Sequence, residues 1–161
     1  MLFVVAAFFG MIWMAPSEVS FRVNEDINAP IDEVFSKVAD HQNFKEWING
    51  VQSTKQERGA GAGVGSSYKL FYKGEGQMIM DLKITGFESE KTYAYIGEVE
   101  DFMRVNVMMT FEAIDSNLTR ISMQNKIEAL SSRMKMFMYA EETHKKNASD
   151  NLEALKQFIE K

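Results

Sequence analysis

Apolar and polar residues alternate along short segments between residues 20 and 127, as they do in strands that bury one face. In the first segment, Phe21, Val23 and Ile27 fall on one face, which Glu25 interrupts. Six further short segments are predicted to be strands: residues 51–56, 68–72, 78–84, 93–95, 105–113 and 119–127. Consecutive short strands joined by turns predict an antiparallel meander.

Two short helices are expected between the first and second strands. Asp32 is expected to cap the first helix, which carries Val34 and Phe35 on its apolar face. The second helix contains Trp47 and ends near Gly50, a residue type that commonly terminates helices. We expect Trp47 to be buried where this helix pair closes over the sheet.

From Ser132 onward the apolar residues recur at spacings of three and four, which is the period of a helix. The pattern predicts one helix from Ser132 to the end of the chain, about 40 Å long. A helix of this length has to bury its apolar stripe on a large surface, and the predicted sheet is the only candidate.

The first residues of the chain differ from the rest. Residues 2–15 carry no charge, and Pro16 separates them from polar sequence. As a helix they would reach roughly 21 Å, which is less than the roughly 30 Å hydrocarbon layer of a bilayer. One interpretation is part of a membrane anchor, and the other is a helix packed on the domain or an exposed tail. We predict an anchor in residues 1–16 and a domain in residues 17–161, membrane-associated through the anchor and otherwise cytoplasmic.

Composition excludes several classes of function. The chain has no cysteine, which rules out disulfides, thiolate metal sites and cysteine nucleophiles. Its net charge of -5 gives no support to nucleic-acid binding. The glycine-rich residues 59–65 lack the Gly-Lys-Ser/Thr of a phosphate-binding loop. We therefore predict no metal site, no cofactor and no nucleic-acid partner.

Four local sequences, in this order and spacing, resemble the SRPBCC (START-like) superfamily, which includes polyketide cyclases and lipid-transport proteins. They are Asn28–Phe35, Phe44–Trp47, Asn117–Ile121 and Asn151–Lys156. The resemblance covers residues 18–161 and implies an α+β helix-grip fold. In that fold a curved antiparallel sheet wraps around a long C-terminal helix, and two short helices follow the first strand. Members bind lipids, quinones or hormones, cyclise polyketides or activate chaperones, so the fold does not settle the function.

The inner faces of the predicted sheet and long helix are rich in methionine and aromatic residues. Either they fill a core or they line a cavity, and the polar residues that interrupt both faces favour a partly polar cavity. The predicted ligand-binding residues are Met78, Met80, Tyr93, Tyr95, Val107, Met109, Met123, Asn125, Met134, Phe137, Met138 and Glu141.

The sequence thus favours binding of a small hydrophobic or lipid-like ligand between the sheet and the C-terminal helix, with transport of that ligand as an extension of binding. One alternative is a cyclase or dehydratase that uses acid–base residues in the same cavity, from the set His144, Glu141, Tyr93, Tyr95 and Arg104. Another is a protein-interaction module. No nucleophile with an oriented base is evident, so no catalytic residue is assigned.

Overall fold

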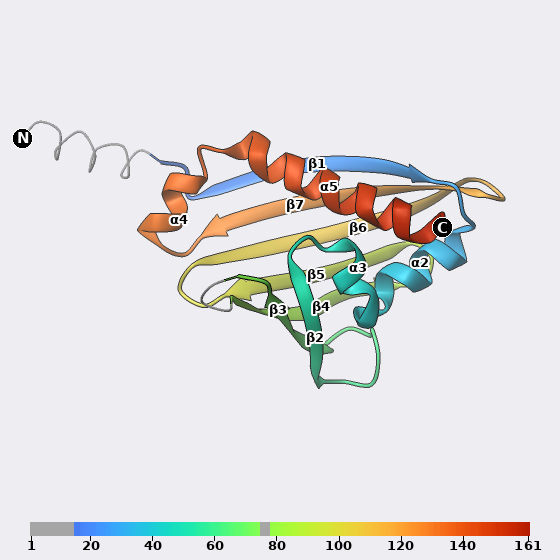
Figure 1. Ribbon diagram of the computed structural model, residues 1–161, viewed down its shortest axis with the longest axis horizontal. Coiled ribbons are helices and arrows are strands. Elements are labelled where there is room, and N and C mark those ends of the chain that lie inside the picture. The colour runs from blue at the N-terminus through green and yellow to red at the C-terminus, as the bar shows by residue number, and fades with distance from the viewer. Residues whose placement is uncertain (1–14, 75–77) are drawn as a thin grey trace, which may run out of the picture.

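The structure is a computed structural model that describes residues 15–74 and 78–161 (Figure 1). Its strands are β1 (Glu18–Ile27), β2 (Val51–Arg58), β3 (Ser67–Tyr72), β4 (Ile79–Glu88), β5 (Thr92–Val99), β6 (Met103–Asp115) and β7 (Leu118–Ala129). Within the described residues they form one seven-stranded antiparallel sheet in the order β1-β7-β6-β5-β4-β3-β2. The predicted meander is confirmed from β2 to β7, and β1 joins the sheet beside β7.

The helices are α2 (Ile31–Ala39), the 3₁₀ turn η1 (His41–Asn43), α3 (Phe44–Trp47), α4 (Ser132–Phe137) and α5 (Glu141–Ile159). Helix α5 crosses the sheet on one side, and α2 and α3 lie on that same side (Figure 1). This arrangement confirms the helix-grip α+β fold with two short helices after the first strand. Trp47 is almost fully buried, as expected.

The cap expected for α2 is wrong. The helix begins at Ile31 directly after Pro30, and Asp32 lies in its first turn rather than before it. Proline suits this boundary because its fixed φ fits the start of a helix, where backbone N–H groups lack intrahelical partners. Asp32 still contributes there, because a negative charge in the first turn is favourable to the helix dipole.

The long C-terminal helix is confirmed, but its predicted continuity from Ser132 is wrong, since α4 ends at Phe137 and α5 begins at Glu141. The two helices bury their apolar sides in different places. Met134 and Met138 belong to a small cluster with Val19 and Ile127, at the start of β1 and the end of β7. Helix α5 instead buries Ala148, Leu152 and Leu155 in the main core. One straight helix could not serve both sites, so the chain breaks between them.

Strand β1 shows how the inner face accommodates a charge. Val23 and Ile27 point into the core as predicted, and Phe21 is partly buried beside them. Glu25 shares this face, and its Oε1 accepts a hydrogen bond of 2.7 Å from Nζ of Lys156 on α5. The apolar face therefore tolerates Glu25 because the helix above supplies a cation.

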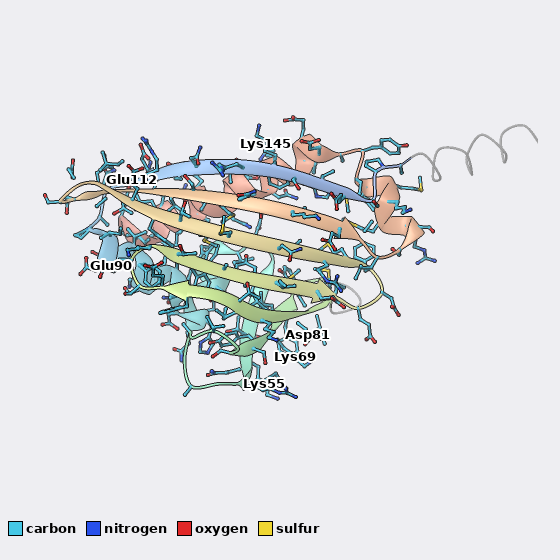
Figure 2. The ribbon with its side chains drawn as sticks, turned by 180° about the vertical axis from the view of Figure 1, so that it is seen from behind. Lys55, Lys69, Asp81, Glu90, Glu112 and Lys145 are labelled. Carbon is cyan, nitrogen blue, oxygen red and sulfur yellow. The ribbon has the colours of Figure 1, made fainter. Side chains whose placement is uncertain are left out.

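The opposite side of the sheet is covered with polar and charged side chains (Figure 2). Many of its cations are paired across strands: Arg120 binds Asp26 through two hydrogen bonds, and Nζ of Lys69 lies 2.7 Å from Oδ1 of Asp81. Exposed pairs of this kind contribute little to stability. They do identify this side as the water-facing one, so the α5 side holds the candidate site.

Candidate functional site

A cavity of about 380 Å³ lies between the sheet and the first half of α5. Every strand except β2 contributes to its wall, together with α5 and the segment between α3 and β2. The lining residues are Phe21, Ile48, Asn49, Gly50, Leu70, Tyr72, Met80, Tyr95, Met103, Val105, Val107, Met123, Asn125, Ile127, His144, Asn147, Ala148 and Asn151.

One row of cross-strand neighbours forms the middle of the wall. Tyr95 on β5 pairs with Val107 on β6, Val107 pairs with Asn125 on β7, and Asn125 pairs with Phe21 on β1. Residues paired across antiparallel strands point to the same side of the sheet. The register therefore places two polar groups, those of Tyr95 and Asn125, on either side of Val107 in a mainly apolar surface.

Asn125 is the most deeply placed amide of the cavity wall. Its side chain is buried, and its Nδ2 has no hydrogen-bond partner within the part of the chain that the structure describes. A buried donor without a partner costs roughly 1–3 kcal/mol. An acceptor atom of a bound molecule would remove this cost, so the Asn125 amide favours a ligand that carries one.

Two tyrosines add phenol groups to the same wall. Burial raises the pKa of Tyr72 to about 12. Burial also raises the pKa of Tyr95, and the neighbouring Tyr72 raises it further. Both phenols are therefore neutral at physiological pH. The hydroxyl of Tyr72 donates to Sδ of Met80, 3.8 Å away.

Helix α5 and the segment after α3 meet at the edge of the cavity. His144, Asn147, Ala148 and Asn151 face it at spacings of three and four residues, as one side of a helix does. The backbone N–H of Asn49 donates to Oδ1 of Asn151 at 2.8 Å, which ties the segment to the helix.

No Asp, Glu, Lys or Arg among the described residues lines the cavity. His144 also lines the cavity, and its Nε2 lies 3.0 Å from the carbonyl oxygen of Phe137. An ionised ligand would thus lose its hydration without gaining an opposite charge, which is costly. The site is suited to neutral molecules.

Five of the twelve predicted ligand-binding residues line this cavity: Met80, Tyr95, Val107, Met123 and Asn125. Four others are buried elsewhere. Tyr93 and Met109 belong to the main core away from the cavity lining, and Met134 and Met138 lie in the small cluster with Val19 and Ile127.

The remaining three predicted residues are exposed and do not line the cavity: Met78, Phe137 and Glu141. Met78 lies just before β4, where the alternation of that strand does not yet apply. Phe137 and Glu141 flank the break between α4 and α5, which the prediction of a continuous helix did not anticipate.

Sequence reasoning missed part of the wall. Leu70 and Tyr72 on β3 were predicted only as strand residues, and Asn49 only as part of a helix end. A signal for the α5 wall was present, because residues 144, 147, 148 and 151 share one helical side and are all small or polar. That composition distinguishes a helix side over a cavity from one over a filled core, such as Leu152 and Leu155 provide.

Two further features bear on function. Among residues 15–74 and 78–161, no group of three His, Asp or Glu side chains is arranged to hold a metal ion. In the same residues, no helix has the length and apolar character needed to cross a bilayer. Residues 1–14 of the predicted anchor lie outside the described residues.

Comparison with known proteins yields one family and many similar structures. Residues 18–160 match the sequence profile of the family described as polyketide cyclase / dehydrase and lipid transport. A comparison with curated proteins finds no match.

Among solved structures, the ZhuI aromatase/cyclase from Streptomyces sp. R1128 superposes with a TM-score of 0.73 at 13% identity, over 89% of this chain and 94% of that one. Ara h 8.0201 gives 0.67 at 17% identity, over 88% and 97% of the two chains. A conserved protein from Geobacillus kaustophilus gives 0.69 at 16% identity, over 88% and 95%. At these identities the likeness is one of fold.

Proposed function

Because the chain belongs to the polyketide cyclase / dehydrase and lipid transport family of the SRPBCC superfamily, we propose that it binds a small, neutral, hydrophobic or lipid-like ligand between the sheet and α5. The observation that carries this proposal is the cavity itself. Its volume of about 380 Å³ lies within the range of small-molecule sites.

The composition of the wall supports the ligand's character. Apolar side chains dominate, and the few polar groups include Asn125 and Tyr95, whose hydrogen-bonding atoms can fix the orientation of a ligand. We expect the bound molecule to carry a neutral oxygen acceptor, such as a carbonyl, that reaches the Asn125 amide. Transport follows as a use of this site if the ligand is released again at a membrane or an enzyme.

Binding is tested with the neutral apolar dye Nile red and the full chain. Val107→Trp places an indole in the middle of the cavity wall, and it should weaken dye binding at least tenfold by filling the space. Met108→Trp is the matched control, because Met108 is the next residue of β6 and is exposed on the other side of the sheet. Both variants keep residues 1–16, so any dye that binds to that segment contributes equally to the two measurements.

Stability measurements complete this test. In a filled core, Val107→Trp would cost roughly 1–3 kcal/mol or more by overpacking. Over a cavity, Val107→Trp should cost less than that and still weaken dye binding at least tenfold. Equal dye affinity in the Val107→Trp and Met108→Trp variants, with a large loss of stability in the former, would refute the proposal.

Acid–base catalysis of the cyclase or dehydratase type is the second candidate. It is favoured by His144, which lines the cavity and belongs to the residue type that most often acts as a general acid or base. His144→Gln separates the two functions. A catalyst would lose turnover of a poly-β-keto substrate with little change in dye affinity, whereas a binding protein would show no turnover in either form.

We also propose that residues 1–16 anchor the domain to a membrane, on the basis of their uncharged apolar sequence. Deleting them should release the protein from lipid vesicles and leave the free energy of unfolding nearly unchanged. If the deletion unfolds the domain, these residues are part of its core and the anchor is wrong.

A further inference from the structure

Helix α4 exposes apolar side chains to an unusual degree. Phe137 is 57% exposed, Met136 is 41% exposed, and Leu130 just before the helix is 38% exposed. Single exposed apolar residues are ordinary on protein surfaces. Three within eight residues of one short segment form a local patch, which is the kind of surface that meets a partner or a membrane.

The same segment carries two cations. Arg133 and Lys135 lie on α4, and neither has an acidic partner within 4 Å among residues 15–74 and 78–161. The cations Arg120 and Lys126 on the outer side of the sheet do have such partners. Glu141 and Glu142 follow at the start of α5, so the surroundings are mixed in charge. Basic residues beside apolar ones are typical of segments that lie in a bilayer interface.

Helix α4 is held firmly, although its outer side is exposed. Its buried residues Met134 and Met138 pack on Val19 and Ile127. Oγ of Ser131 accepts a hydrogen bond from the backbone N–H of Met134 at 3.1 Å, which caps the helix. The exposed residues are therefore presented by a fixed platform.

The position of α4 links it to the apolar start of the chain. The carbonyl oxygen of Ser17 accepts a hydrogen bond of 2.8 Å from the backbone N–H of Ala129, next to Leu130. The uncharged residues 2–15 thus join the domain beside the segment that leads into α4. In Figure 1, α4 lies at the end of the molecule where β1 begins.

Helix α4 is also adjacent to the cavity. The carbonyl oxygen of Phe137 is bonded to His144, which lines it, and Ile127 contributes both to the cluster under α4 and to the cavity wall. A molecule bound to α4 would therefore lie close to the end of the cavity that His144 and Ile127 line.

We propose that the α4 surface, consisting of Leu130, Arg133, Lys135, Met136 and Phe137, docks on a lipid bilayer. Met136 and Phe137 enter the boundary between head groups and acyl chains, and the two cations contact lipid phosphates. This surface is separate from the anchor proposed for residues 1–16, which only tethers the chain. Docking of α4 fixes the domain's orientation and turns the cavity end beside His144 toward the bilayer, from which an apolar ligand could enter.

The test measures contact between α4 and lipid in the full chain. Trp13→Phe removes the tryptophan of the apolar segment, and Phe137→Trp adds one on α4. Trp47 stays as a constant buried background. Vesicles of phosphatidylcholine and phosphatidylglycerol, with the acyl chains brominated near the head groups, quench tryptophans at that depth. We expect the emission added by Phe137→Trp to fall roughly twofold on these vesicles, relative to unbrominated ones, as suits insertion of roughly 5–10 Å.

The matched control combines Trp13→Phe with Met108→Trp, whose added tryptophan is exposed on the far side of the sheet, and it should not be quenched. Met136→Trp serves as a second α4 variant. Vesicle binding without quenching at either α4 position would mean attachment through residues 1–16 alone and would overturn the proposal. Equal quenching at position 108, or no binding to vesicles, would also overturn it.

A blue-shifted α4 emission that is insensitive to vesicles would instead indicate a protein segment over α4. Nile red binding without vesicles is measured separately, so failure of the docking surface leaves the cavity proposal standing.

Discussion

The two ends of the space beneath α5 differ, although the same strands pass under both. Toward the C-terminal end of the helix, Leu152 and Leu155 are almost fully buried in close-packed core. Toward its N-terminal end, His144, Asn147 and Ala148 face the cavity. Ala148 and Leu152 lie one turn apart on the same side of α5. The smaller side chain of Ala148 therefore marks where the close-packed core under the helix gives way to the cavity.

Helix α2 explains the filled end. It carries Phe35, whose ring packs edge-to-face on Phe87 and Phe111 with centroid distances of 5.3 and 5.1 Å. At the cavity end, no helix of the described residues inserts a phenylalanine in this way, and Met80, Tyr95 and their neighbours on the strands make up most of the wall. The close-packed contacts and the proposed ligand site thus lie at different ends of one sheet. Substitutions should therefore separate stability from binding.

The largest effect is expected at the filled end. Phe35→Ala removes a buried ring from the aromatic cluster and should lower the free energy of unfolding by about 3–5 kcal/mol. Urea denaturation measures the loss. Nile red affinity at the far end should stay within about twofold, provided that the variant is folded at the assay temperature. A loss below about 1 kcal/mol would show that this end is not the stabilising one.

A pair of substitutions on α5 sharpens the comparison. Leu152→Ala opens a hole in the filled end and should cost about 2–5 kcal/mol. Ala148→Leu adds volume one turn earlier, where the cavity can accept it, so it should cost less than roughly 1 kcal/mol and weaken dye binding. Thermal unfolding and dye titration of both variants test this. Similar costs for the two would mean that the helix is packed alike along its length.

Stability at alkaline pH tests whether the Tyr72 phenol in the cavity wall is shielded from water. The folded-state pKa of Tyr72 is raised to about 12, above the value of about 10 in an unfolded chain. The unfolded chain therefore releases this proton first as pH rises, so the stability from Tyr72 is complete below about pH 10 and is lost toward pH 12. Tyr72→Phe should reduce the slope of stability against pH in this window by about 1 kcal/mol per unit. Identical slopes would mean that the phenol is hydrated.

The smallest effect is expected for Gly97→Ala. The added Cβ would lie 2.6 Å from Sδ of Met80 and 3.1 Å from Cγ2 of Val105, and both side chains line the cavity. Met80 can swing into the hollow, so stability should change by less than about 1 kcal/mol while dye affinity falls. Gly86→Ala is the control, because its Cβ would lie 3.1 Å from the Cβ of Ala94, which cannot swing away. If Gly97→Ala is the more destabilising of the two, the cavity does not accommodate the displaced Met80 side chain.

Much of the fold followed from local patterns. Alternation placed Val23, Ile27 and their strand neighbours correctly, because burial of one sheet face imposes a period of two. The break between α4 and α5 did not follow, since Met134 and Met138 keep a helical spacing with the residues after them. Only the tertiary arrangement reveals that they pack on a different part of the sheet.

The candidate site was predicted less completely for a related reason. Tyr95, Val107 and Asn125 were found because they alternate on strands whose phase is clear. Tyr93 and Met109 have the same phase and belong to the same buried cluster, but they do not line the cavity. The sequence indicates which side of a strand faces inward, but the position along the strand where filling stops depends on which helix residue lies opposite.

The placement of β1 has a consequence for how the protein is made. Glu18 at its start is paired with Glu128 near the end of β7, and all the other strands lie between them in the chain. During synthesis, β1 has no partner strand until the intervening strands and β7 have been made. During that interval it presents unsatisfied backbone hydrogen-bonding groups, a feature that favours aggregation. The sheet therefore closes through its most distant pairing, which is a slow route to a native fold.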